Sequence, residues 1–154
     1  LPQLISSAEA MEGGIDLLEP ELAKNRSAKS LGTVVIATVE HDIHDIGKNL
    51  VAMMIESAGF EVIDLGVDVP VEKFIEAVRE NPDVKVVGVS ALLTTTMPAM
   101  KETVEALNKE DFRKDIKIMV GGAPITPEFA EEIGADAYTA DAASAAQVAK
   151  SLAA

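Results

Sequence analysis

The densest group of residues able to do chemistry lies in one segment, Glu40-His41-Asp42-Ile43-His44-Asp45-Ile46-Gly47, which holds both histidines of the chain. A histidine two residues from a carboxylate, in a loop, can have one ring nitrogen oriented by that carboxylate. The other nitrogen is then free to bind a metal or to accept a proton. This is the functional interpretation of Asp42 and His44. The structural alternative is a solvated polar loop in which Asp45 caps the following helix, and spacing alone does not separate the two.

Two later segments could also contact a ligand. Ser90-Ala91-Leu92-Leu93-Thr94-Thr95-Thr96-Met97-Pro98 has three consecutive threonines, whose hydroxyls could bind a ligand or cap a helix with Pro98 in its first turn. Gly121-Gly122 permits positive φ angles or the close approach of a ligand to the backbone, although a simple turn is the commoner explanation of such a pair.

Composition excludes several classes of function. The 154 residues, 48% apolar and 25% charged, suit one globular domain with room for a small appendage. A net charge of -13 disfavours nucleic acid and anionic membrane surfaces as partners. The absence of cysteine removes disulfides, zinc-thiolate sites, iron–sulfur ligation and thiol nucleophiles. No apolar run approaches the roughly 20 residues that cross a bilayer, and no signal peptide opens the chain, so we expect a cytoplasmic protein.

The elements that must position these residues alternate along the chain. Apolar, β-branched runs predict strands over Thr33–Val39, 61–65, Val84–Ser90, 116–120 and Ala137–Thr139. Helical patterns follow each strand, over 48–58, from Val71 to Asn81, from Met97 through Leu107, over 127–133 and over 142–152. This alternation predicts the α/β class, a five-stranded parallel Rossmann-like (flavodoxin-like) sheet with helices on both faces. Function is then expected in the loops that follow the strands, at one rim of the sheet.

Together, Asp42-x-His44-x-x-Gly47, Ser90-x-Leu92 and Gly121-Gly122 resemble the pattern of cobalamin-binding domains, over roughly residues 30–152. The run from Asp42 to Asn49 is most similar to methionine synthase and to the small corrinoid proteins of methyltransferase systems. The resemblance implies that residues 1–28 are the remnant of an N-terminal helical domain with a linker, and that residues 29–154 are the corrinoid-binding domain.

The resemblance also implies roles for residues. His44 is the lower axial ligand of cobalt, replacing the corrinoid's own base, while Asp42 holds its ring and Thr96 completes a hydrogen-bonded relay. The displaced nucleotide tail runs down into the sheet between the loops. The full set of implied cofactor-binding residues is Asp42, His44, Asp45, Ile46, Gly47, Ser90, Leu92, Thr94, Thr96, Gly121, Gly122, Tyr138, Thr139 and Ala140.

The function implied is that of a methyl carrier rather than a complete enzyme. It accepts a methyl group from a substrate:corrinoid methyltransferase and delivers it to a methyl-acceptor methyltransferase, with a reductive activator as a further partner. Two alternatives stay open at this point. One is the cobalamin-binding subunit of an adenosylcobalamin-dependent mutase. The other is a metal-dependent hydrolase with His41, Asp42, His44 and Asp45 as metal ligands.

Overall fold

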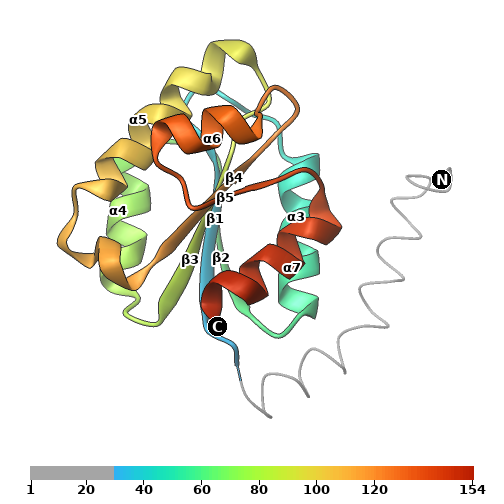
Figure 1. Ribbon diagram of the computed structural model, residues 1–154, viewed down its shortest axis with the longest axis vertical. Helices are drawn as coiled ribbons and strands as arrows, with labels where there is room; N and C mark the ends of the chain where they lie inside the picture. The colour runs from blue at the N-terminus through green and yellow to red at the C-terminus, as the bar shows by residue number, and fades with distance from the viewer. Residues whose placement is uncertain (1–29) are drawn as a thin grey trace, which may run out of the picture.

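The computed structural model describes residues 30–154, which form a five-stranded parallel sheet between two layers of helices (Figure 1). The strands are β1 (Thr33–Val39), β2 (Glu61–Val69), β3 (Val84–Ser90), β4 (Lys117–Gly121) and β5 (Ala137–Thr139). Their order across the sheet is β2-β1-β3-β4-β5. β2 and β3 therefore lie on opposite sides of β1. The connections after β1 and after β3 run to opposite sides of the sheet, which opens a crevice at the carboxyl ends of these two strands. The predicted fold class is confirmed; the helical remnant predicted before it lies outside the described residues.

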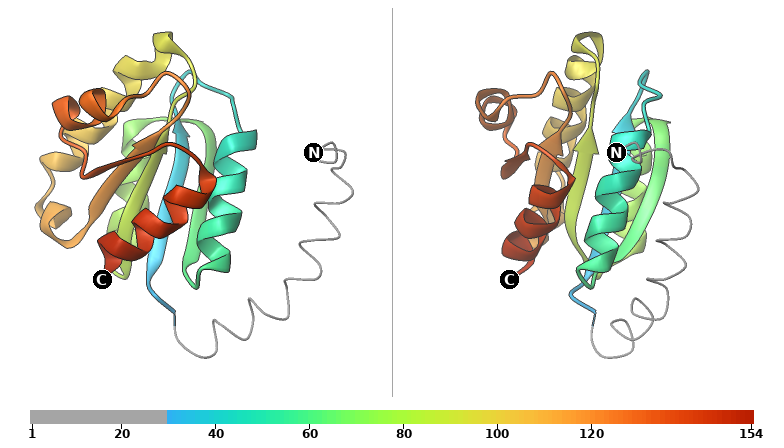
Figure 2. Two further views of the ribbon diagram at one scale, coloured as in Figure 1. Left: turned by 45° about the vertical axis from the view of Figure 1, so that its right-hand side comes forward. Right: turned by 90° about the vertical axis from the view of Figure 1, so that its right-hand side faces the viewer.

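The helices cover the two faces unequally. They are α3 (Ile46–Ser57), α4 (Val71–Glu80), α5 (Met97–Asn108), α6 (Pro127–Ile133) and α7 (Ala142–Ala153), with 3-10 turns η1 (Thr94–Thr96) and η2 (Asp111–Asp115). Figures 1 and 2 show α4, α5 and α6 on one face of the sheet and α3 and α7 side by side on the other. None of these helices is long and apolar enough to cross a membrane.

The central strands form because their residues suit a strand that is covered on both faces. All seven residues of β1 are buried, and β3 is buried except at Lys85 and Ser90, as expected for β-branched runs inside a parallel sheet. The edge strand β2 differs from its prediction, which ended at Leu65. It continues to Val69 because pairing with β1 resumes at Gly66 and Val69 after two register shifts. The loop at the rim therefore starts four residues later than predicted.

Two apolar clusters hold the helices to the sheet. The larger cluster packs α4, α5 and α6 against the sheet through side chains such as Phe74, Met100 and Leu107. The smaller one holds the carboxyl-terminal end of α3 and the middle of α7 through Ile55, Phe60 and three alanines of α7. Leu50 of α3 and Ala142 of α7 instead border a pocket, and Val51 lies between the cluster and this pocket, so the core on this face stops short of the rim.

Gly122 provides a test of how tightly the rim is built. Its φ angle is +132°, and a Cβ there would lie 1.8 Å from the carbonyl oxygen of Ala91. Gly122→Ala is therefore expected to lower the free energy of unfolding by about 2–5 kcal/mol, through backbone strain and steric overlap.

The matched control is Gly47→Ala. A Cβ at Gly47, in the first turn of α3, would meet no atom within 4 Å. Alanine is the better helix former by about 0.5–1 kcal/mol, so this variant is expected to be as stable as the wild type or slightly more stable. Urea unfolding of the two variants measures the contrast, and equal stabilities would contradict it.

Candidate functional site

The loop that follows β1 is held in place by β2. The N–H of His41 donates to Asp68 Oδ1 at 2.7 Å, and the N–H of Asp68 donates to the carbonyl of Asp42 at 2.9 Å. Both His41 and Asp68 have positive φ angles, which other than glycine few residues adopt. The hydroxyl of Thr38, on β1, donates to the carbonyl of His44 at 2.9 Å. These bonds hold the backbone on either side of Asp42.

Asp42 is fully buried, and both of its carboxylate oxygens accept hydrogen bonds. Oδ1 accepts from the N–H of His44 at 3.1 Å and lies 2.7 Å from His44 Nδ1. Oδ2 accepts from the N–H of Leu92 and from the hydroxyl of Thr96, each at 2.7 Å. One carboxylate thus joins the loop after β1 to the segment after β3, and the side chains of Asp42, His44 and Thr96 form one chain of hydrogen bonds.

This environment favours the ionised form of Asp42. Burial by itself raises the pKa of this carboxyl, but the hydrogen bonds from Leu92, Thr96 and His44 together outweigh it and lower the pKa from 3.8 to about 2. An ionised carboxylate only accepts, so Nδ1 of His44 carries the proton and Nε2 of the neutral ring has a free lone pair. The His44 side chain is 48% exposed, so this nitrogen is available to a ligand at the rim.

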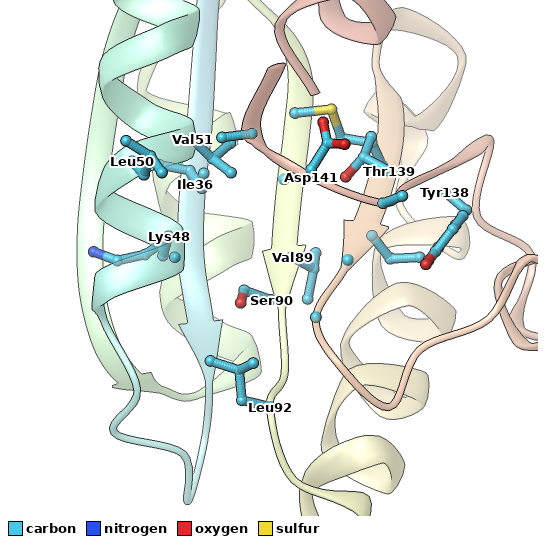
Figure 3. Close-up of a pocket in the computed structure, with 18 of the residues that line it drawn as sticks. Ile36, Lys48, Leu50, Val51, Val89, Ser90, Leu92, Tyr138, Thr139 and Asp141 are labelled. Atoms are coloured by element: carbon cyan, nitrogen blue, oxygen red, sulfur yellow. The ribbon is translucent and has the colours of Figure 1, made fainter. Parts of the chain in front are cut away.

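A pocket of about 380 Å3 opens beside this loop, between α3 and α7 (Figure 3). This volume lies within the roughly 300–1,000 Å3 range of small-molecule sites. Its floor follows from the sheet register, since alternate residues of a strand face the same side. Ile36, Gly88 and Met119 are neighbours across β1, β3 and β4 and form one row, and Ser90 and Gly121 belong to the next row toward the rim.

The structure places most of the predicted residues in one of two groups. Those that line the pocket are Gly47, Ser90, Leu92, Gly121, Gly122, Tyr138, Thr139 and Ala140. The second group is the hydrogen-bonded chain of Asp42, His44 and Thr96. Asp45 pairs with Lys48, at 2.8 Å, and Ile46 is an exposed residue at the start of α3.

Thr94 is not brought to either group. It is exposed at the start of η1 and is not among the residues that line the pocket. The short turn of η1 buries Thr96 against Asp42 instead, and residues two apart in such a turn point in different directions. The expected place of Thr94 beside a bound tail is therefore not supported.

Sequence analysis missed several residues of the site. Gly88 and Met119 belong to the pocket floor, and Lys48 lines its wall. One signal was present: a lone glycine inside the apolar run Val84–Ser90 is typical of a strand that a ligand or another backbone approaches closely. Lys48 gave no such signal, because a lysine on a helix is normally exposed.

The hypothesis of a metal hydrolase is wrong for the residues that it named. Among residues 30–154, no group of three or more histidine or acidic side chains is arranged to hold a metal ion. The reason is that the four side chains have separate partners or directions. Asp42 is buried and bonded to Leu92 and Thr96, whereas Asp45 pairs with Lys48.

Similar sequences and structures among known proteins indicate the family of this chain. Residues 32–149 match the B12 binding domain. The chain is 46% identical over 153 residues to dimethylamine corrinoid protein 2 of Methanosarcina acetivorans, covering 99% of this chain and 70% of that protein. Its structure is similar to the monomethylamine corrinoid protein of Methanosarcina barkeri, with a TM-score of 0.78 and 42% identity, covering 99% and 71% of the two chains. It also resembles a chain of the methanol:cobalamin methyltransferase complex of the same organism, with a TM-score of 0.75 and 35% identity, covering 99% and 57%.

The chain therefore belongs to the B12-binding family, among the corrinoid proteins of methyltransferase systems. Its cofactor is cobalamin or a related corrinoid.

The residues present fit such a cofactor. The pocket has glycines where a side chain would reduce its volume: a Cβ at Gly47 would meet open space, and one at Gly88 would point at Ile36 and Met119. Four large apolar side chains are exposed in the segments that follow β1 and β3. Ile43 and Ile46 lie on either side of His44 in the sequence, Leu50 is on α3, and Leu93 follows β3. An apolar surface of this kind is typical of a site that a ligand covers.

The lowered pKa of Asp42 predicts a pH-dependent stability for the apoprotein. A carboxylate with a lowered pKa stabilises the fold above its unfolded pKa, and this contribution is lost as the pH falls through the folded value. The shift from 3.8 to about 2 is worth about 2 kcal/mol at pH 7, of which about 1 kcal/mol is lost by pH 3. Asp42→Asn is expected to remove this contribution.

Urea unfolding at several pH values tests this expectation. The difference in the free energy of unfolding between the wild type and Asp42→Asn should narrow as the pH falls from 5 toward 2. Asp115→Asn, at an exposed position far from the rim, serves as the control and keeps the wild-type pH profile. A gap that is independent of pH would contradict the prediction.

Proposed function

We propose that this methyl-carrying corrinoid protein holds its corrinoid with His44 as the lower ligand of cobalt, in place of the corrinoid's own base. The observation that carries the proposal is the buried Asp42 carboxylate, which accepts a hydrogen bond from Nδ1 of His44. This leaves Nε2 without a partner among residues 30–154, on a half-exposed side chain at the rim, beside a pocket. Imidazole nitrogen is a good ligand for cobalt, and a carboxylate on the other ring nitrogen fixes the orientation of the ring.

The protein's own residues orient the ligand and govern its proton. A bound corrinoid supplies a cobalt centre that accepts and releases a methyl group. Asp42 presents one nitrogen of His44 and stabilises the ring when it is protonated, while Thr96 and the N–H of Leu92 keep the carboxylate in position. The hydrogen bond to Asp42 thereby keeps the ring proton of His44 on Nδ1 and would leave Nε2 for a bound corrinoid.

The pocket between α3 and α7 is the proposed site of the displaced nucleotide tail. Its floor combines apolar side chains of Ile36 and Met119 with the hydroxyl of Ser90 nearer the rim. A flat base suits the apolar part, and its polar atoms need partners such as hydroxyls once they are buried. We assign Gly47, Ser90, Leu92, Gly121, Gly122, Tyr138, Thr139 and Ala140 to this tail site.

The similarity to dimethylamine and monomethylamine corrinoid proteins supports a methylated amine as the methyl source. The proposed partners are a substrate:corrinoid methyltransferase, a second methyltransferase that removes the methyl group, and a reductive activator. We propose residues 29–154 as the corrinoid-binding domain and residues 1–28 as the end of a preceding helical domain, in a cytoplasmic protein. The same relatives favour methyl transfer over the mutase alternative.

Ligation by His44 is tested by electron paramagnetic resonance of the cobalt(II) protein. The wild type is expected to retain hydroxocobalamin on gel filtration. After reduction, each high-field line should be a triplet with unlabelled protein and a doublet with 15N-labelled protein, because the coordinating nitrogen then belongs to the protein. His44→Ala should bind the cofactor without this isotope effect. A triplet that persists in labelled wild-type protein would show that the cofactor's own base stays on cobalt.

The tail pocket is tested by Gly47→Leu. A side chain at position 47 meets no protein atom at its Cβ, so the variant is expected to fold normally while part of the pocket is filled. The dissociation constant for cobalamin should rise by about tenfold or more, a loss of at least about 1.4 kcal/mol. Binding of cobinamide, which lacks the nucleotide tail, is the control and should not change. Equal weakening for both corrinoids would place the tail elsewhere.

A further inference from the structure

The amino-terminal half of α3 is held to the protein in an unusual way. Lys48 and Ile55 are the buried residues of this helix, and Ile55 packs in the apolar cluster at its lower end. Nearer the rim, Gly47 and Leu50 border the pocket, and Val51 borders it while packing against the edge of the smaller apolar cluster. Apolar packing therefore contributes little to holding α3 where it follows His44.

Lys48 supplies the missing anchor. Its side chain is 2% exposed, and its ammonium lies 2.6 and 2.8 Å from the two carboxylate oxygens of Asp64 on β2. The same ammonium lies 2.8 Å from Oδ1 of Asp45, the residue that immediately precedes α3. In Figure 3 the side chain of Lys48 extends from α3 away from the pocket, with its amine farthest out. We call Lys48, Asp45 and Asp64 the α3 anchor.

The charges of the α3 anchor are well matched to its burial. Burial lowers the pKa of Lys48, but the bonds to Asp45 and Asp64 outweigh it and the net shift is upward, so the ammonium stays charged. Asp64 Oδ1 also accepts from the N–H of Gly66, where β2 resumes its pairing with β1. The anchor thus connects the first turn of α3 to a fixed point of the sheet.

Asp45 is the residue directly after His44 and precedes the first residue of α3. A shift of the first turn of α3 would move the backbone of His44, whose N–H and Nδ1 both meet Asp42 Oδ1. Ligand geometry is sensitive to such shifts, and changes in the groups that orient a ligand typically weaken metal binding about 10- to 100-fold.

We propose that Lys48 is a positioning residue, which holds His44 in its ligating geometry by tying Asp45, at the start of α3, to Asp64 of β2. The proposal rests on the proposed ligation of cobalt by His44 and adds a residue outside the ligand and its hydrogen-bonded chain. Lys48 touches neither Asp42 nor His44 in the hydrogen bonds of the site, so its effect is transmitted through the backbone.

Lys48→Met tests the proposal because methionine keeps an apolar stem of similar length and removes the charge. Asp45 and Asp64 are partly exposed and can be solvated, so the fold is expected to survive. In 15N-labelled protein reconstituted with hydroxocobalamin and reduced to cobalt(II), the ratio of histidine-bound to unbound cobalt should fall about tenfold. In the apoprotein, the amide of His44 should exchange its hydrogen faster than in the wild type.

Two further variants make the result independent of any folding defect in Lys48→Met. Lys48→Arg keeps a cation that can pair with both carboxylates and should restore most of the histidine-bound signal. Asp64→Asn should lower the ratio of histidine-bound to unbound cobalt, as Lys48→Met does. If Lys48→Met does not fold, the result for Asp64→Asn tests the role of the α3 anchor.

The matched control is Arg113→Met. Arg113 pairs with Asp136 at 2.7 Å next to the start of β5, at the end of the sheet opposite the rim. Its loss should lower stability without changing the cobalt spectrum. A labelled wild type with no doublet would overturn the ligation by His44 and this inference with it. A wild-type doublet that Lys48→Met and Asp64→Asn leave unchanged would overturn the role of Lys48 alone.

Discussion

The rest of the site depends on one buried carboxylate. Burying an ionised aspartate is costly unless its oxygens are hydrogen-bonded, and Asp42 meets this condition with donors from two segments about 50 residues apart. Those donors can reach it only if β1 and β3 are neighbours in the sheet, which the strand order β2-β1-β3-β4-β5 provides. The chemistry of the site therefore depends on the strand order. If β1 and β3 were not neighbours, Asp42 would lack the hydrogen bonds from Leu92 and Thr96 and could not fix the ring of His44.

Space for a ligand in this fold is obtained by removing side chains from one face of the sheet. Gly88 and Gly121 lie on the face that α3 and α7 cover, and the apolar cluster on that face is the smaller of the two. The consequence is a helix whose first turns border a pocket instead of a core. The proposed α3 anchor compensates for this loss: the ammonium of Lys48 is buried, which reduces the screening of its attraction to the partly exposed carboxylates of Asp45 and Asp64.

The sequence predicts those parts of the molecule that depend on local pattern. β1 and β3 are predicted correctly because their residues are apolar and β-branched throughout, whereas the end of β2 depends on register shifts that its own residues do not encode. The spacing of Asp42 and His44 is compatible with an oriented ring but equally with a solvated polar loop, and only the structure, in which Asp42 Oδ1 lies 2.7 Å from His44 Nδ1, separates the two. The role of Thr96 in the hydrogen-bonded relay is predicted only through the resemblance, because its partner Asp42 is 54 residues away in the sequence. Residue type alone does not distinguish Thr96 from Thr94. The place of Gly88 on the pocket floor follows only from the strand register, and the burial and partners of Lys48 follow only from the path of α3.

The two halves of the site make opposite demands, and the structure meets them in different ways. The proposed ligating nitrogen must be accessible, and the His44 side chain is half exposed, while Ile43 and Ile46, on either side of it in the sequence, are exposed. It must also be held still, yet exposed apolar residues contribute little to holding a loop. The rigidity therefore comes from polar contacts: the buried Asp42 orients the ring, the exposed Asp68 fixes the backbone before it, and the buried Lys48 anchors the helix after it. These polar contacts, rather than apolar packing, stabilise a surface that stays free for a ligand.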